Sequence, residues 1–218
     1  ADQILSTRVA DISCGSGAFL LEAYQLMHDT LVDYYIEHDK KQLDQIGINS
    51  FKLTFDRKKQ LLTNCIFGVD KDYGATQACK FGLLLKLLEG ENNKTISFPA
   101  LPILDNNIQC GNSLIYFSMS TSVVNVEEIN PYEFEGDKFD VIIGNPPYLA
   151  TKHMKTLMPA EFNLYKENYT SAYQQFDKYF LFVERALDLL SDDGLMGYII
   201  PLKFMKVAAG KKLRELLT

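Results

Sequence analysis

Short apolar runs alternate with longer amphipathic stretches along the chain. The apolar runs predict buried strands at Thr7–Ile12, Cys65–Val69, Asn107–Cys110, Phe139–Ile143 and Leu195–Ile200. Most of these runs are apolar at nearly every position, which is typical of strands covered on both faces of a parallel sheet. Loops are expected over Asn92–Asn106 and Ser118–Asp137, where prolines interrupt the pattern.

Between the runs, apolar residues recur every three or four positions, as they do on the buried face of a helix. The first helix is predicted from Gly17 to about Gln45, with a stripe of Leu20, Tyr24, Met27, Leu31 and Tyr34 or Tyr35. Further helices are predicted at about Phe55–Thr63, Gly74–Leu88, Phe176–Leu190 and from near Phe204 onward. Ala150–Tyr173 is polar and aromatic without a clear period, so a lid or substrate loop is expected there.

This order of elements predicts βαβ units, because parallel strands need a crossover connection. The expected fold class is α/β, with a mostly parallel sheet and helices on both of its faces. The 218 residues can bury a full core without a metal or disulfide. No apolar run reaches the roughly 18 residues of a membrane span, and the first residues lack the features of a signal peptide.

Charge and the positions of cysteine and histidine limit the kinds of binding site that the chain can carry. The net charge of −6 argues against a protein that binds nucleic acid with its whole surface, although the basic stretch near the end leaves a local patch open. The four cysteines match no zinc spacing, so they are expected to be buried thiols in a reducing cytosol. The three histidines fall at no metal-ligand spacing, and no metal site is expected.

A glycine turn follows the first predicted strand in the sequence VADISCGSGAFL. Gly15 and Gly17 permit positive φ angles and a close approach of a ligand to the backbone. The dinucleotide fingerprint needs a third glycine where this chain has Leu20, so a pyrophosphate cofactor is disfavoured. Asp11 at the strand end suits a cationic ligand such as an amino group or a sulfonium.

Polar residues end the second and third strands. Asp70 in IFGVDKD stands where a carboxylate can accept hydrogen bonds from both hydroxyls of a ribose. The alternative, a helix-capping role, fits Asp72 better. The glycine turn and Asp70 are far apart in the sequence, so the first crossover is expected to carry an insertion. Asn112 in IQCGNSL could meet an adenine edge.

The tetrapeptide Asn145-Pro146-Pro147-Tyr148 ends the fourth strand and is the most specific feature of the sequence. Two prolines make a rigid rim without N–H donors, and carbonyl oxygens remain as acceptors. With the Asn145 amide oxygen, this rim can accept both hydrogens of a planar amino group. The Tyr148 ring offers a flat surface for stacking on a base.

From Val9 to about Met205, these motifs resemble the S-adenosylmethionine-dependent N6-adenine DNA methyltransferases of the gamma class. The stretch NCIFGVDKDYGATQACKFGLLLKLLEG resembles in particular the methylase part of large single-chain type II restriction–modification enzymes. The resemblance implies a Rossmann-like methyltransferase fold and S-adenosylmethionine as the cofactor. It implies double-stranded DNA with a flipped adenine as the partner. Ile12 departs from the family pattern, in which many members carry proline.

The resemblance assigns roles to single residues. Asp11, Gly15 and Gly17 would surround the methionine part of the cofactor, while Asp70 would hold the ribose. The adenine of the cofactor would be met by Asn112 and packed on by Phe182. The expected cofactor site is completed by Cys14, Phe19, Lys71 and Ser113.

The catalytic motif is matched by Asn145, Pro146, Pro147 and Tyr148. The mechanism implied is a direct displacement, in which bonds from the target amine to Asn145 and to the Pro146 carbonyl localise the nitrogen lone pair. Positioning then supplies much of the rate, and the target base must leave the DNA helix.

The resemblance divides the chain into a cofactor half, residues 1–117, and a catalytic-motif half, residues 138–218. A complete sheet of this family has more strands than the five predicted here. The last strands, a target-recognition domain and the helix before the first strand are therefore expected to be absent. A nuclease, fused or associated, would also lie outside these residues. We expect this piece alone to have little methylation activity, and the whole protein to lie in the cytoplasm near the nucleoid.

Two other functions remain open. The same acceptor geometry serves methyltransferases that act on a glutamine side-chain amide or on an RNA adenine, although those enzymes are usually more compact. A non-catalytic cofactor-binding module is the other alternative, and the intact Asn-Pro-Pro-Tyr motif argues against it.

Overall fold

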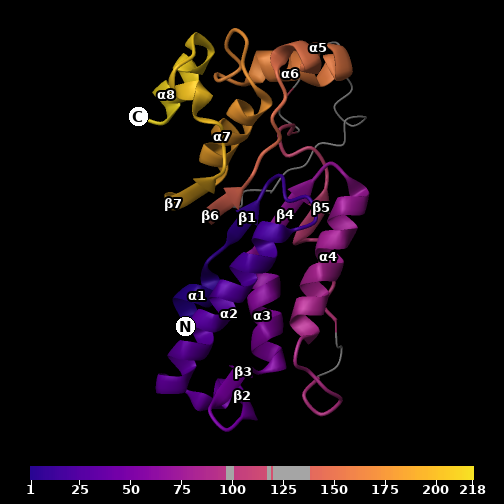
Figure 1. Ribbon diagram of the computed structural model, residues 1–218, viewed down its shortest axis with the longest axis vertical. Helices are drawn as coiled ribbons and strands as arrows, with labels where there is room; N and C mark the ends of the chain where they lie inside the picture. The colour runs from indigo at the N-terminus through magenta and orange to yellow at the C-terminus, as the bar shows by residue number, and fades with distance from the viewer. Residues whose placement is uncertain (97–100, 117–118, 120–137) are drawn as a thin grey trace.

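The computed structural model describes residues 1–96, 101–116, 119 and 138–218 (Figure 1). The α-helices are α1 (Asp2–Ser6), α2 (Ala18–His38), α3 (Phe55–Cys65), α4 (Tyr73–Leu88), α5 (Thr151–Leu157), α6 (Pro159–Asn168), α7 (Lys178–Leu189) and α8 (Lys211–Leu216). The strands are β1 (Val9–Asp11), β2 (Leu43–Gly47), β3 (Ser50–Leu53), β4 (Ile66–Asp70), β5 (Ile108–Cys110), β6 (Phe139–Gly144) and β7 (Leu190–Tyr198). Short 3-10 turns occur at η1 (Lys40–Gln42), η3 (Leu202–Met205) and η4 (Ala208–Gly210).

Five strands form one parallel sheet in the order β5-β4-β1-β6-β7. All five correspond to predicted strands, and the parallel α/β architecture is confirmed. The sheet crosses the middle of the molecule, between α1–α4 on one side and α5–α8 on the other (Figure 1). The chain places β4 and β5 on one side of β1, and β6 and β7 on its other side. The order therefore reverses at β1, which is where open α/β sheets bind their ligands.

Alternate residues along the strands place their side chains in two separate hydrophobic cores, one on each face of the sheet. In β1, Val9 faces a core shared with α2, α3 and α4, whereas Ala10 faces a core shared with α7. In β6, Val141 packs against the core shared with α2, α3 and α4, and Ile142 lies in the core shared with α7. This two-residue period confirms that helices cover both faces of the sheet.

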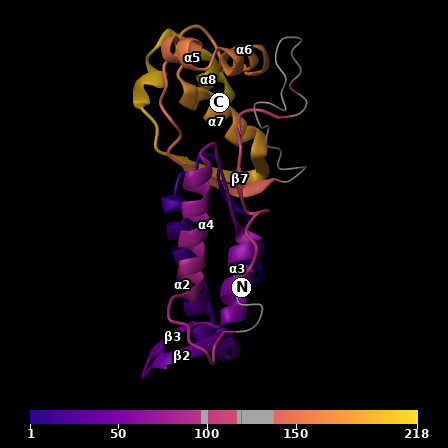
Figure 2. The same cartoon turned by 90° about the vertical axis from the view of Figure 1, so that its right-hand side faces the viewer.

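The crossover from β1 to β4 carries the predicted insertion, but its form differs from the expectation. The first helix ends at His38, not near Gln45, and β2 and β3 form an antiparallel hairpin. The stripe on α2 is confirmed with Tyr35, and not Tyr34, as its buried end. The hairpin buries little beyond Lys52 and Leu53, so it leaves no apolar periodicity in the sequence. Figure 2 shows it at the end of the molecule opposite α5 and α6.

Three other segments also differ from the prediction. The expected loop over 150–173 contains α5 and α6, and α6 begins at Pro159. The expected helix from Phe204 is two 3-10 turns followed by α8. A short helix, α1, does precede β1. The described part of the 92–106 segment is irregular as predicted, while the predicted loop at 118–137 lies almost wholly outside the described residues.

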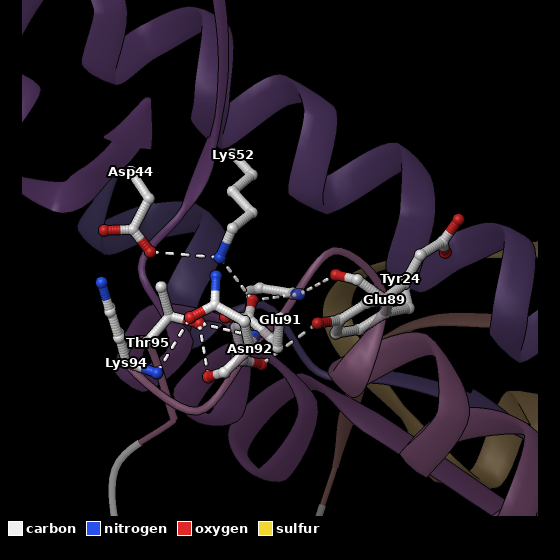
Figure 3. A network of polar contacts seen from close by, with 9 residues as sticks. Tyr24, Asp44, Lys52, Glu89, Glu91, Asn92, Lys94 and Thr95 are labelled. Carbon is white, nitrogen blue, oxygen red and sulfur yellow. Dashed lines mark hydrogen bonds and ion pairs between the residues drawn. The ribbon is translucent and has the colours of Figure 1, made fainter. Parts of the chain in front are cut away.

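A buried ionic network joins the β2–β3 hairpin to α3 and to the segment that follows α4 (Figure 3). The side chain of Glu91, which follows α4, is only 1% exposed. Its Oε1 accepts hydrogen bonds from Lys52 on β3 at 2.6 Å and from Lys58 on α3 at 2.7 Å. Lys52 also donates to Asp44 on β2 at 3.1 Å. One carboxylate thus joins three elements of the insertion to the end of α4.

Replacing Glu91 by glutamine is expected to lower the free energy of unfolding by about 3 kcal/mol, because two lysines lose a buried counter-charge. Burial raises the pKa of Glu91, but the bonds from Lys52 and Lys58 outweigh it and the net shift is downward. The stabilisation is therefore present above the unfolded pKa of about 4.3 and lost as pH falls through the lower folded value. Urea unfolding of both proteins across this pH range measures the difference.

The control is Asp105→Asn, which breaks the exposed pair between Asp105 and Lys80. Exposed pairs contribute about 0–1 kcal/mol, so this variant should stay close to the original stability. Equal losses for Glu91→Gln and the control would show that the Glu91 network does not fasten the insertion.

Candidate active site

The carboxyl ends of four parallel strands meet at one edge of the sheet. There β1 ends at Asp11, β4 at Asp70, β5 at Cys110 and β6 at Gly144. A cleft of about 250 Å³ opens at this edge. It is lined by half of the predicted site residues: Asp70, Lys71, Asn112, Ser113, Asn145, Pro147 and Phe182. The structure thus brings five of the ten predicted cofactor residues and two of the four residues of the catalytic motif to one cleft.

The glycine turn after β1 has the backbone that the sequence predicts. Gly15 has a φ of +52° and Gly17 a φ of +87°. A Cβ on Gly17 would lie 2.4 Å from the Cys79 sulfur of α4, so this glycine lets the turn pack on the helix. A Cβ on Gly15 would meet no atom within 4 Å, so the backbone there is bare. The turn can therefore admit a ligand directly against Gly15.

Asp70 accepts hydrogen bonds from the turn and has acceptor positions left for a ligand. Its carboxylate accepts hydrogen bonds from the backbone N–H groups of Gly15 and Asp72, both at 2.9 Å. A carboxylate has about four acceptor positions, so two remain for the hydroxyls of a ribose. The predicted capping role of Asp72 is confirmed, since its side chain accepts from the Ala75 N–H at the start of α4.

Asp11 is a buried carboxylate at the centre of the sheet edge. It is 1% exposed and accepts a hydrogen bond from the Ser13 N–H at 2.9 Å. Burial raises its pKa to about 7, and the charge of Asp70 adds to the rise. A Cβ on Gly144 would lie 2.6 Å from its Oδ1, so only glycine fits there. A cationic ligand nearby would favour the ionised form of Asp11, and the predicted role of Asp11 stays a prediction.

Tyr198 on β7 is a residue that the sequence analysis missed. Its hydroxyl is buried and has no hydrogen-bond partner among the described residues. Burial raises the pKa of this hydroxyl, and the Asp11 carboxylate raises it further. This hydroxyl lies within the electrostatic influence of Asp11, but Tyr198 is not one of the residues that line the cleft.

Two residues of α6, also missed, contact lining residues of the cleft. Glu161 forms an ion pair with Lys71 and accepts a hydrogen bond from the Asn112 side chain at 3.1 Å. The Tyr165 hydroxyl accepts from the same Asn112 amide at 3.1 Å. Asn112 is therefore buried with its amide group already bonded, and its predicted contact with the cofactor adenine stays a prediction. No sequence signal placed α6 here, because the segment lacks a clear period.

Phe182 and Lys178 lie one helical turn apart on α7 and both line the cleft. Phe182 is 5% exposed and is therefore largely buried where it lines the cleft. Lys178 is buried, and it forms no ion pair with a described acidic residue. Burial lowers its pKa, although Glu161 opposes the shift. This ammonium can donate to an acceptor atom of a bound molecule, a role that the sequence did not indicate.

The Asn-Pro-Pro-Tyr tetrapeptide forms the rim of the cleft after β6. Pro146 is buried, whereas Asn145, Pro147 and Tyr148 are exposed. The Tyr148 hydroxyl lies 2.5 Å from Asn145 Oδ1 and 2.8 Å from the Ile199 carbonyl oxygen. One hydroxyl proton can serve only one of these acceptors at a time. Tyr148 can therefore donate to Ile199 while Asn145 Oδ1 accepts from a substrate.

Two predicted cofactor residues lie away from the cleft. The Cys14 side chain packs in the core between the sheet and α4. Phe19 on α2 lines a separate apolar groove with α1, β1 and β6. Ser113 lines the cleft and donates to the Ile12 carbonyl at 2.7 Å, which ties the β5 loop to the end of β1.

The described residues contain no group of acids, histidines and cysteines that could hold a metal ion. The four cysteines form no disulfide, and Cys110 is half-buried where full burial was expected. Within the same residues, no helix is both long and apolar enough to span a membrane.

The chain is similar to restriction–modification proteins in sequence. Residues 64–218 match the family described as Eco57I restriction-modification methylase. The chain is 54% identical over 218 residues, 99% of its length, to the type II restriction enzyme and methyltransferase RM.Eco57I of Escherichia coli. It is 28% identical over 211 residues to the type II methyltransferase M.BstVI of Geobacillus stearothermophilus. The chain spans 22% and 31% of these relatives, respectively.

Solved structures share its fold. The M protein of the type I restriction enzyme EcoKI aligns over 97% of this chain and 34% of its own, with a TM-score of 0.55 and 16% identity. The type ISP restriction–modification enzyme LlaGI aligns over 96% of this chain and 17% of its own, with a TM-score of 0.59 and 13% identity. These alignments support the methyltransferase fold, and the sequence match is decisive for the family: this chain belongs to the Eco57I restriction–modification methylases.

Proposed function

We propose that this chain carries the cofactor-binding and catalytic residues of a DNA methyltransferase that acts on the N6 amino group of adenine within a restriction–modification system. Residues 1–117 would form the cofactor half and residues 138–218 the catalytic half. The observation that carries the proposal is the position of Asn145 and Pro147 on the same cleft as Asp70 and Phe182. S-adenosylmethionine, when bound there, supplies an electrophilic methyl group on a sulfonium.

The residues of the cleft suit both reactants. Asp70 can accept from ribose hydroxyls, and the bare backbone at Gly15 admits the ligand beside the Asp11 carboxylate. Phe182 provides an aromatic surface for the cofactor adenine. We assign Asn112, Lys71 and Ser113 to the same wall.

The catalytic step rests on hydrogen-bond acceptors. Asn145 Oδ1 and the Pro146 carbonyl would accept the two N–H bonds of the target amine, so that its lone pair points at the methyl group. Tyr148 is exposed on the rim and would stack on the base after it leaves the helix, with a contribution of about 1–3 kcal/mol. Positioning of this kind can replace a strong general base.

The proposal extends to the whole protein. We propose that the whole protein acts on DNA and that a target-recognition domain and a nuclease, fused or associated, accompany these residues. The names of RM.Eco57I, a restriction enzyme and methyltransferase, and of an LlaGI structure with a DNA substrate mimic support this arrangement. We place the protein in the cytoplasm, near the nucleoid.

Methyl incorporation by the complete gene product tests the proposal. DNA, RNA and a protein extract are each incubated with the enzyme and S-adenosylmethionine that carries a labelled methyl group. We expect label in DNA alone. Label in RNA or in protein would favour the other amine-directed methyltransferases, and no label in any acceptor would favour a non-catalytic module.

A further inference from the structure

A further hollow, of about 490 Å³, lies beside the catalytic rim. It is a groove between α5, the start of α7 and the segment that follows β7. Three lysines line it: Lys152 and Lys155 from α5, and Lys203 from η3. Aromatic residues of α7, among them Tyr179, form part of its wall.

The charges in this groove are not balanced. All three lysines are exposed, and none forms an ion pair with an acidic residue in the described part of the chain. Lys155 has a ring contact, with its ammonium 5.4 Å from the centre of the Phe162 ring. Asp177 is the acid that lines the groove, and its Oδ1 accepts from the Leu149 N–H at 2.8 Å. Three cations thus face one groove in a chain whose net charge is −6.

The groove and the cofactor cleft are neighbours, with Tyr148 between them. The Tyr148 hydroxyl contacts Asn145, which lines the cleft. Its ring packs edge-on against Tyr179, which lines the groove, with 5.8 Å between ring centres. Tyr179 in turn donates to the Pro201 carbonyl at 3.1 Å, two residues before Lys203. A nucleotide held against Tyr148 would therefore have its flanking backbone beside the lysines.

We propose that Lys152, Lys155 and Lys203 bind phosphates of the DNA strand that carries the target base, next to the flipped nucleotide. The inference rests on the proposed function and adds the surface on which the substrate backbone lies. Lysine contacts to phosphate position a strand without reading its sequence. The groove would then hold the strand while Asn145 holds the base.

The test measures the salt dependence of DNA binding by the complete gene product. Fluorescence anisotropy gives the Kd for a labelled duplex at several salt concentrations, for the original protein and for the variant Lys152→Gln/Lys155→Gln/Lys203→Gln. Each lost phosphate contact should lower the slope of log K against log salt by about 0.9. We expect a slope smaller by between two and three, and a Kd raised about a hundredfold at roughly 0.1 M salt.

Controls separate this inference from its alternatives. Lys41→Gln, in η1 at the opposite end of the molecule, should leave the slope unchanged. The triple variant should lose DNA affinity equally for duplexes with and without the recognition site. Its affinity for S-adenosylmethionine should equal that of the original protein. Each of the three single lysine-to-glutamine variants should lower the slope by about one. These variants test the phosphate contacts one at a time if the triple variant is unstable.

Two results would overturn the inference. An unchanged slope in a protein that methylates DNA would remove the lysines from the DNA surface while leaving the proposed function intact. A slope that falls for RNA but not for DNA would assign the groove to a different substrate. Absence of methyl transfer to DNA by the original protein would instead defeat the proposed function itself.

Discussion

Replacing Asn145 by alanine is expected to slow methyl transfer to DNA about 100-fold or more. The variant loses the amide oxygen at the rim of the cleft, which is the acceptor proposed for the target amine. Loss of one preorganised hydrogen-bonding group at a reacting centre typically costs about 10²–10³ in rate. A single-turnover assay with labelled S-adenosylmethionine and saturating DNA measures this step directly, and cofactor affinity should stay the same.

Tyr148→Phe is the matched comparison for Asn145→Ala. It removes the hydroxyl that contacts Asn145 Oδ1 and the Ile199 carbonyl but keeps the aromatic ring. We expect a smaller loss of rate than for Asn145→Ala, because stacking on the base is retained. A methyl-transfer rate in Asn145→Ala equal to that of the original protein would show that this amide does not bind the reacting amine.

Replacing Asp70 by alanine is expected to weaken S-adenosylmethionine binding about a hundredfold. The side chain has two acceptor positions left for ribose hydroxyls after its bonds to Gly15 and Asp72. A hydrogen bond to a charged group contributes about 1.5–3 kcal/mol, and about 1.4 kcal/mol corresponds to a tenfold change in affinity. Calorimetric titration of the complete gene product measures the Kd, and NAD, which should not bind, is the comparison ligand.

The neighbouring Asp72→Ala serves as the control for Asp70→Ala. Asp72 carries the same charge two residues away, but its side chain caps α4 through Ala75. This variant should lose about 1 kcal/mol of stability and keep its cofactor affinity. If Asp70→Ala bound S-adenosylmethionine as tightly as the original protein, the cofactor would have to lie elsewhere.

Much of the fold could be predicted because the spacing of apolar residues along the chain follows which side chains are buried. The five strands of the parallel sheet bury side chains on both faces, and their positions were predicted to within a few residues. The hairpin β2–β3 was missed because it is held by Lys52, Lys58 and Glu91, and ionic contacts between distant residues leave no periodic signal. The short helices α5 and α6 were missed because each is too brief to show a period of its own.

The candidate site was predictable where a motif ends a strand. Asp70 and Asn145 meet at one cleft because parallel strands end at the same edge. Lys178, which lines the cleft, and Glu161, which contacts Lys71 and Asn112 of its wall, were not predictable, because they lie on helices whose placement follows from tertiary packing. Cys14 and Phe19 lie close to the motif in sequence, but the direction of each side chain takes it away from the cleft.

The nucleosides of methylated DNA show directly whether the N6 amino group of adenine is the methyl acceptor. The complete gene product is incubated with S-adenosylmethionine and unmethylated DNA, and the DNA is digested to nucleosides for mass spectrometry. We expect N6-methyladenine in the product of the original protein and its loss in the product of Asn145→Ala. Methylated cytosine in place of methylated adenine, or N6-methyladenine formed equally well by Asn145→Ala, would contradict it.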